Sequence, residues 1–327
     1  MAYREAPGKS YVEKLKRKGC LFISTGLMEE LDNQLRELGV PAGMITIHAA
    51  PIPEDRPDTD PQALYVGYPS LYDTSEYIAD EVKIEVSVRS LQLPSATVSV
   101  QSLLFRFNPR PAYAEIPFQV AAAEARKTFL EKAFLLHEEF GKPDRSRIRT
   151  ERMSRHLYDL FRMMHTDIGE QALSDHALYD RLIRHREWYS RISWVDYRSL
   201  GHETLSFLPA AEVMEDYRRD YQTMQEQMIY EETAPFDELI RQLKLLQGKF
   251  RLKYERKALG EIIDDALKQL QASGLSGKTD GNFYETDVVY DPGSYVPGGT
   301  GDKRVIYKVV FLYQNEQLIF ERIAAIV

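Results

Sequence analysis

One predicted helix carries side chains that could bind phosphate. Arg152, His156 and Asp159 recur at i, i+4 and i+7, a spacing that places three residues on one face of a helix. This face could form the wall of an active site, with Arg152 and His156 binding phosphate. The same spacing is typical of a polar helix flank in water, so both interpretations stay open.

A basic segment leads into this helix. Between Lys142 and Arg155, six basic residues stand against two acidic ones, a local net charge of +4 on a chain whose formal net charge is −8. Such a patch could attract an NTP or the end of an RNA. A solvated loop would have the same composition. The candidate RNA contacts are Lys142, Arg145, Arg147 and Arg149.

Three polar residues each have a structural interpretation that needs no chemistry. Glu85 alternates with aliphatic residues on a predicted strand and could be a solvated cross-strand partner. Lys132 lies beside a helical stripe of Phe, Leu and Ala and could extend from a core helix into water. Asp159 has arginines four residues before it and three after it, which is the spacing of surface ion pairs worth only about 0.3–0.5 kcal/mol each.

The joint occurrence of these three residues favours a functional interpretation. A strand with a glutamate between aliphatic residues (82–86) is followed by a helix start with Lys132 (126–133) and by a helix with Asp159 (155–160). In this order the segments resemble the later motifs of the nucleotidyltransferase AbiEii/AbiGii toxin-like family, within the polymerase-β-like superfold. The resemblance extends over residues 15–250, and the helix pair with Lys132 and Asp159 is its most specific part.

The resemblance implies metal-dependent transfer of a nucleotide. In the family, a Gly-Ser turn holds the nucleotide phosphates, and an Asp-x-Asp strand with a third acidic residue binds two Mg²⁺ ions that activate a hydroxyl and stabilise the leaving pyrophosphate. Glu85 would be the third carboxylate and a metal ligand. Lys132 would contact the NTP phosphates, and Asp159 would orient Lys132 or help to bind the nucleotide.

The resemblance also implies a biological role. The protein would be the toxin of a toxin–antitoxin system of the phage-defence type, and it would attach a nucleotide to an RNA or protein acceptor. A cognate antitoxin protein is a candidate partner. The alternative is a catalytically inactive relative that binds a partner through its helical domain.

Two of the family's motifs are missing before Glu85. Asp58 and Asp60 are the one Asp-x-Asp pair there, and they lie between prolines without aliphatic neighbours, which is typical of a loop and unsuited to a central strand. In the family, the missing motifs would precede the basic helix at residues 10–19. We therefore expect Met1 to fall just downstream of them, and this chain alone to be inactive or nearly so.

Hydrophobic periodicity predicts the elements that position these residues. Leucine spacing indicates a helix over residues 25–38, after the basic helix at 10–19. Strands are expected over 44–49 and 64–68, and alternation of aliphatic and polar residues predicts a third over 82–89. Residues 121–272 are predicted to be helical almost throughout, with helices after the Lys132–Asp159 pair at 174–190, 209–232, 234–247 and 255–273.

The expected fold class is α/β, followed by a mainly helical domain and a short β-rich tail. The predicted parts are a remnant of an α/β nucleotidyltransferase domain at 1–120, a helical domain at 121–273 and a tail at 274–327. In the tail, residues 304–313 and 317–326 flank a short polar turn and predict a terminal β-hairpin.

Composition excludes several classes of protein. The chain is 43% hydrophobic and 28% charged, which is typical of a folded soluble protein. Cys20 is its single cysteine, so neither an internal disulfide nor a cysteine-based metal cluster can form. No apolar run approaches the ~20 residues that a membrane-spanning helix needs, and no signal-peptide pattern opens the chain. We expect a cytoplasmic protein without membrane contact.

Overall fold

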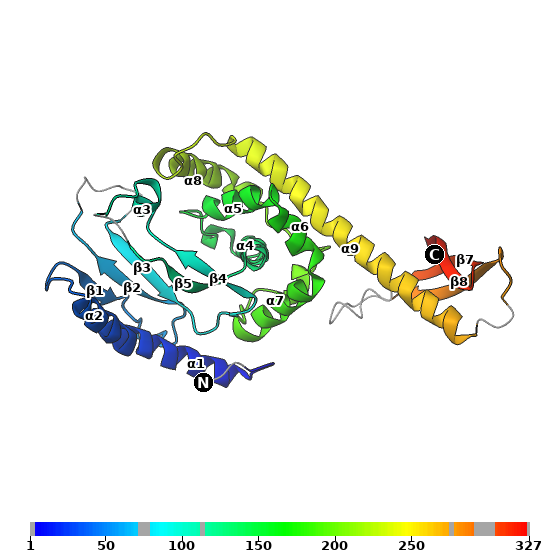
Figure 1. Ribbon diagram of the computed structural model, residues 1–327, viewed down its shortest axis with the longest axis horizontal. Helices are drawn as coiled ribbons and strands as arrows, with labels where there is room; N and C mark the ends of the chain where they lie inside the picture. Colours follow the sequence, from blue (N-terminus) through cyan, green and yellow to red (C-terminus); the bar gives the residue numbers. More distant parts are fainter. Residues whose placement is uncertain (1–3, 71–78, 112–114, 275–277, 291–304, 326–327) are drawn as a thin grey trace.

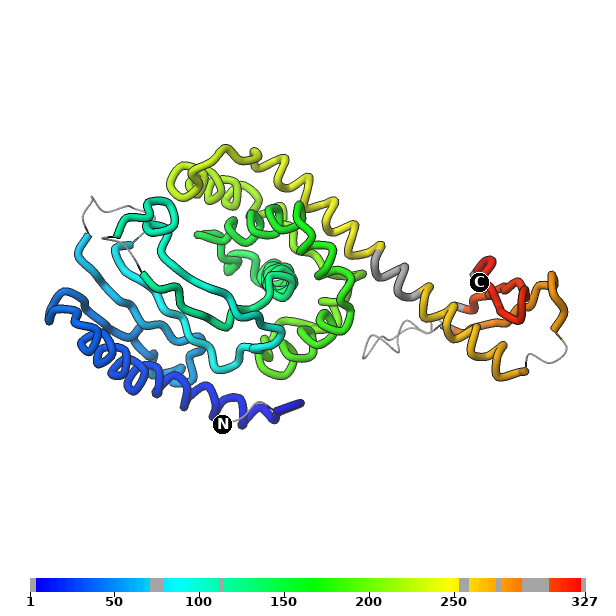
Figure 2. Tube along the Cα trace, viewed as in Figure 1, coloured from blue at the N-terminus to red at the C-terminus, as the bar shows by residue number. Residues whose placement is uncertain are grey.

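The computed structural model describes residues 4–70, 79–111, 115–274, 278–290 and 305–325 (Figure 1). The fold is mixed α/β, with small antiparallel sheets, a helical body and a β-rich C-terminal sheet, in agreement with the predicted class. The long helix α9 (Phe236–Ala272) leads from the main body to the C-terminal sheet (Figure 2). The domain boundaries at residues 120 and 273 stay a prediction. Within the described residues, no helix combines the length and the apolar character that a bilayer crossing needs.

The first two predicted helices are one continuous helical stretch. Helix α1 (Lys9–Phe22) passes through a π-helical turn at Ile23–Leu27 into α2 (Met28–Glu37). The predicted helix end at Gly19 is wrong, because Gly19 serves close packing instead: a Cβ at this position would lie 2.4 Å from a methyl carbon of Val88.

The N-terminal sheet places Glu85. It consists of β1 (Thr46–Ala49), β2 (Gln62–Gly67) and β3 (Glu81–Val86), all antiparallel, with β2 in the middle. The middle strand is mostly buried, and Ala63 on it lies opposite Glu85 on β3. The three predicted strands are therefore present, although the third ends three residues earlier than expected, at Val86.

A second sheet, which the sequence did not predict, lies in the chain between β3 and α4. It pairs β4 (Ser95–Val100) with β5 (Phe118–Ala123), and the short helix α3 (Leu103–Phe107) lies between them in the chain. The prediction of helix from residue 121 is wrong, since α4 begins at Ala125. The alanines at 121–123 favour a helix locally, but backbone pairing with β4 overrides that preference.

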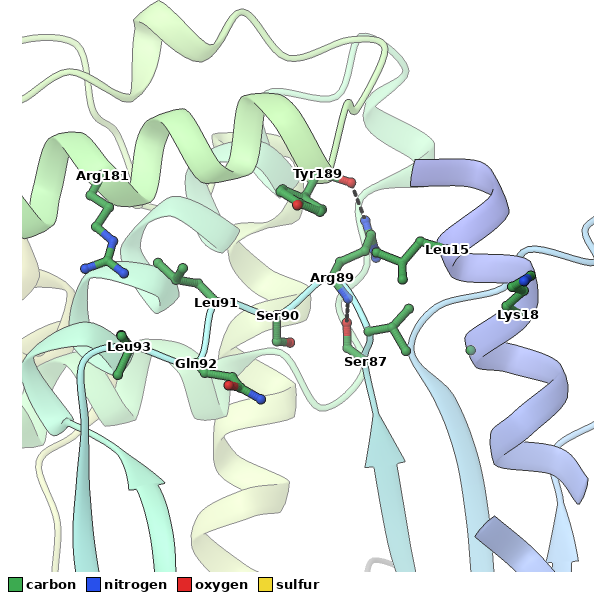
Figure 3. A pocket seen from close by; sticks show the side chains of 12 residues that line it. Leu15, Lys18, Ser87, Arg89, Ser90, Leu91, Gln92, Leu93, Arg181 and Tyr189 are labelled. Atoms are coloured by element: carbon green, nitrogen blue, oxygen red, sulfur yellow. Dashed lines mark hydrogen bonds between the residues drawn. The ribbon is translucent and has the colours of Figure 1, made fainter. Parts of the chain in front are cut away.

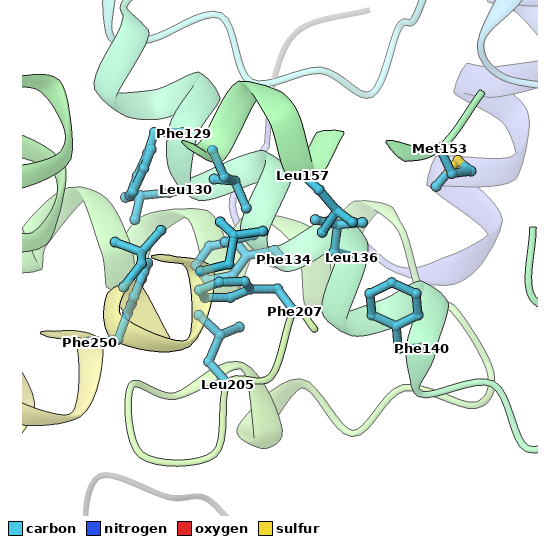
Figure 4. Close-up of a cluster of buried hydrophobic side chains, with 14 of the residues drawn as sticks. Phe129, Leu130, Phe134, Leu136, Phe140, Met153, Leu157, Leu205, Phe207 and Phe250 are labelled. Atoms are coloured by element: carbon cyan, nitrogen blue, oxygen red, sulfur yellow. The ribbon is translucent and has the colours of Figure 1, made fainter. Parts of the chain in front are cut away.

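The helical body surrounds one hydrophobic core. It comprises α4 (Ala125–Phe140), α5 (Ser154–Met164), α6 (Asp167–Ser174), α7 (His176–Tyr189), α8 (Met214–Gln227) and the first half of α9. Phe129, Phe134, Phe207 and Phe250 are completely buried in this core (Figure 4). The predicted helices 234–247 and 255–273 are a single helix, α9, because the segment between them contains no proline, and its one glycine, Gly248, costs a helix interior only about 1 kcal/mol.

The C-terminal part has its own, smaller core. Strands β6 (Phe283–Tyr290), β7 (Val305–Gln314) and β8 (Gln317–Ala325) form an antiparallel sheet in this order, which packs on Ile262, Ala266 and Leu270 of α9. The predicted hairpin is thus present, with a third strand beside it. Asn315 and Glu316 in its turn have φ of 52° and 62°, as a two-residue type I′ turn requires.

Candidate functional site

Helices α4 and α5 bring three of the predicted residues together. The Nζ atom of Lys132 lies 2.5 Å from Oδ2 of Asp159 and 3.4 Å from Nδ1 of His156. The Lys132 side chain is 21% exposed, so its ammonium group is shielded yet still reachable from solvent. We call these three residues the Lys132 cluster.

The electrostatics of the cluster fix the protonation of His156. Burial, followed by the positive charges of Lys132 and Arg155, lowers the pKa of His156 to about 4. The imidazole is therefore neutral at pH 7, and its Nδ1 can accept a hydrogen bond from Lys132. Its proton then resides on Nε2, which is left as a donor. This arrangement is compatible with the predicted hydrogen bond from His156 to a phosphate.

The start of α5 is held by Asp220 from α8. The carboxylate of Asp220 accepts hydrogen bonds from the backbone N–H of Arg152 at 2.6 Å and of Ser154 at 2.8 Å. A third bond comes from the Ser154 hydroxyl at 2.5 Å. A carboxylate at this position satisfies free N–H groups of a helix N-terminus and interacts favourably with the helix dipole. Asp220 thereby fixes the helix that carries His156 and Asp159.

Arg152 does not share a helix with His156 and Asp159. It precedes α5, in a left-handed backbone conformation with φ of 56°. The predicted helix face of three residues is therefore wrong for Arg152, because the chain turns at this position to present two N–H groups to Asp220. Binding of phosphate by Arg152 stays a prediction.

Glu85 lies in an ion pair on its own strand. Its Oε1 is 2.8 Å from Nζ of Lys83, and both side chains are about half exposed. The hydrogen bond from Lys83 to Glu85 raises the pKa of Lys83, whereas the positive charge of Arg155 lowers it. Arg155 is therefore close enough to act on Lys83, so this part of β3 lies near the start of α5.

The described residues do not supply the donor set of a two-Mg²⁺ site. Among them, no group of three or more His, Cys, Asp or Glu residues lies close enough to hold a metal ion. The loop carboxylates are engaged elsewhere, since Asp58 pairs with Lys16 at 2.5 Å and Asp60 pairs with Arg89 at 2.5 Å. Magnesium, and Glu85 as its ligand, stay predictions.

Much of the basic segment stabilises its own loop. Lys142 and Arg149 both bind the buried carboxylate of Glu139, with Arg149 Nε at 2.9 Å. Burial would raise the pKa of Glu139, but hydrogen bonds from Arg149 and Lys142 hold it below its ordinary value. Arg145 donates to the backbone oxygen of Phe140. Three of the four candidate RNA contacts therefore have internal partners, and RNA binding by this segment stays a prediction.

A cavity of about 770 Å³ lies between α1, the β3–β4 connection and α7 (Figure 3). It was not predicted from the sequence, because its walls come from three segments that are far apart in the chain. A signal was present in the connection itself, where residues 87–93 place two serines, an arginine and a glutamine directly after the strand of Glu85.

Comparison with known proteins gives one match. A family model described as "Nucleotidyl transferase AbiEii toxin, Type IV TA system" matches residues 25–242. The matched range contains β1–β5, α4, α5 and the whole Lys132 cluster. No curated protein and no solved structure matches the chain.

Proposed function

The chain belongs to the nucleotidyl transferase AbiEii toxin family of type IV toxin–antitoxin systems, and from this premise we propose that it acts on NTPs. In this proposal it transfers a nucleotide from an NTP to an RNA or protein acceptor, and the Lys132 cluster binds the phosphates. A cytoplasmic location and a cognate antitoxin are part of the same proposal. The cytoplasmic location is proposed because the cytoplasm supplies NTPs. The antitoxin is proposed because the family is the toxin of a toxin–antitoxin system.

One observation carries this proposal: Lys132 is held between two helices by Asp159 and by a neutral histidine. An ammonium group is a compact point charge that suits phosphate oxygens. Holding it in place before the ligand arrives reduces the entropy lost on binding. The exposed Arg155, which acts on both His156 and Lys83, adds positive charge at the same place.

The chemistry would be an in-line displacement. The hydroxyl oxygen of the acceptor forms a bond to the α-phosphorus and gives up its proton to solvent. The bond from that phosphorus to the bridging oxygen breaks, and pyrophosphate leaves with the electron pair. Lys132 would stabilise the negative charge on the phosphates, Asp159 would orient Lys132, and the Nε2–H of His156 would donate to a phosphate oxygen. All three roles are assigned to side chains of this chain.

Lys132→Met is expected to weaken NTP binding about ten- to a hundredfold, because it removes a charged hydrogen-bond donor but keeps much of the side-chain volume. Isothermal titration with each of the four NTPs would measure the Kd. Lys244→Met is the matched control, since Lys244 is an exposed lysine on α9 outside the cluster. Wild-type affinity in a folded Lys132→Met variant would contradict the proposal, and so would the absence of NTP binding to the wild type.

A transfer assay adds a second readout. Radiolabelled NTP, Mg²⁺ and an RNA or protein acceptor would be incubated with the wild type and with Lys132→Met. Turnover by residues 1–327 that vanishes in the variant would show that this chain completes a catalytic site. Binding without turnover would support the phosphate site and leave the chemistry to groups that the described residues do not provide.

Partner binding is a second candidate function, and an exposed apolar surface favours it. In the β4–β5 sheet, Val98 lies opposite Val120 and Val100 opposite Phe118, so these four side chains share one face. Near them in the chain are the exposed side chains of Leu103, Leu104, Phe107 and Ile116. The backbone N–H of Ser102 donates to Glu115, which brings α3 next to the segment before β5.

The size of this surface fits a second copy of the chain. Ile116 is 92% exposed and Phe107 is 78% exposed. Summed side chain by side chain, these eight residues expose roughly 700–900 Å², which is the order of a large apolar patch. It is comparable with the roughly 800 Å² that each partner buries in a standard interface. We propose that two copies pair through this face.

Light scattering after size exclusion would test the pairing. The wild type is expected to have twice the mass of one chain at micromolar concentration, and Phe118→Lys is expected to be monomeric, because the charge would have to be buried in the interface. Gln119→Lys on the opposite face of β5 is the matched control and should remain dimeric. A wild type that stays monomeric at about 100 µM, well above the Kd of a stable dimer, would contradict this candidate.

A further inference from the structure

The cavity between α1, residues 87–93 and α7 has the size of a small-molecule site. Its volume of about 770 Å³ falls within the roughly 300–1,000 Å³ that is usual for ligand pockets. Leucines and Tyr189 form apolar walls, and Ser87, Ser90 and Gln92 add neutral hydrogen-bonding groups. None of the three residues of the Lys132 cluster lines it.

The charged groups of the cavity are all basic. Lys18, Arg89 and Arg181 line it, and no acidic residue does. Arg89 is compensated, because its Nε lies 2.5 Å from Oδ2 of the buried Asp60 and its Nη2 donates to the Asp60 backbone oxygen at 2.7 Å. The side chains of Lys18 and Arg181 have no ion pair or hydrogen bond with any other part of the chain that the structure describes. Two positive charges at the cavity are therefore left for a ligand.

These two charges lie at opposite ends of the cavity. In Figure 3, Arg181 projects from α7 on one side and Lys18 from α1 on the other, with Ser90, Leu91, Gln92 and Leu93 between them. A ligand that satisfies both cations needs an anionic group near each end. Its middle part would lie against leucines and could hydrogen-bond to Ser90 and Gln92.

We propose that this cavity binds a small molecule with a phosphate group near each end and a partly apolar body. Arginine matches a phosphate with two parallel N–H donors, and lysine matches it as a point charge. The apolar walls and the neutral polar groups suit a nucleoside or a body of similar size. This site is separate from the one proposed for NTP phosphates, and it stands on different residues.

A dinucleotide of adenosine that carries one phosphate on its 5′ end and one on its 3′ end is a suitable bisphosphate probe of this class, because its two terminal phosphates are separated by the nucleoside body. Isothermal titration of the full chain is expected to show saturable binding of the bisphosphate, weaker binding of inorganic phosphate and none of adenosine. Arg181→Gln and Lys18→Gln are each expected to raise the Kd about tenfold or more, because each removes one charged hydrogen-bonding group. Arg184→Gln on α7 and Lys14→Gln on α1 are the matched controls, since both residues are exposed and neither lines the cavity.

The Lys132→Met variant separates this proposal from the NTP site. If both proposals hold, this variant loses NTP affinity and keeps bisphosphate affinity, whereas Arg181→Gln does the opposite. Bisphosphate binding that is unaffected in both cavity variants would overturn the inference. So would adenosine binding as tight as that of the bisphosphate, or no saturable binding at all. Lys18 and Arg181 are both exposed, so their variants are expected to fold, and circular dichroism would verify this.

Discussion

Replacing Glu138 with alanine is expected to destabilise the fold by about 3–5 kcal/mol, because the change leaves a buried guanidinium without its counter-ion. Glu138 on α4 and Arg186 on α7 are 6% and 16% exposed, and the Arg186 Nε donates to Glu138 Oε1 at 2.7 Å. Burial would lower the pKa of Arg186, but the bonds to Glu138 keep it above its ordinary value. Urea denaturation followed by circular dichroism would give the free energy of unfolding.

Two further variants make this prediction specific. Glu187→Ala removes an exposed carboxylate next to Arg186 and should change stability by less than about 0.5 kcal/mol. The double variant Glu138→Leu/Arg186→Met should recover most of the loss, since apolar residues can replace a buried ion pair at little cost. A Glu138→Ala variant as stable as the wild type would contradict the prediction, because it would mean that water reaches Arg186 in the folded protein.

Phe250→Ala is expected to cost about 3–5 kcal/mol, because it leaves a large cavity where α9 meets the helical body. Phe250 is completely buried and lies against four rings, with centroid distances of 6.2 Å to Phe129 and 5.5 Å to Phe207. Tyr179 and His202 complete this aromatic group. The same denaturation experiment measures the effect.

The matched control for Phe250 lies two residues further along α9. Leu252 is 56% exposed, so Leu252→Ala should cost no more than about 0.5 kcal/mol. A small loss in Phe250→Ala would mean that the first half of α9 does not pack on the body as described. An equal loss in both variants would point to helix propensity rather than to packing.

Local patterns in the sequence determined most of the elements near the candidate site. The alternation around Glu85 gave strand β3, and the apolar stripes gave the pair α4 and α5 that carries Lys132 and Asp159. Both signals are periodicities of a single segment, and burial of one face is enough to produce them. The motif order also led to the family that the comparison confirms.

Only the tertiary structure decided how distant segments meet. The alanines of β5 carry no strand signal, and they form a strand because residues 95–97 of β4 pair with them across a chain separation of 24 to 28 residues. Gly19 resembles a helix end, yet it stays helical because Val88 packs against it. Arg152 leaves the helix face because Asp220, 68 residues away in the chain, caps α5.

In the candidate site, too, some features follow from the sequence and others only from the tertiary structure. Residue types and spacing are local properties, so Lys132, His156 and Asp159 could be named from the sequence. Partner choice between distant segments depends on distances in space, so the capping of α5 by Asp220 and the basic cavity required coordinates. The free energies of burial and of ion pairing depend on contacts between residues that become neighbours only when the chain folds, so a pattern within one segment does not contain them.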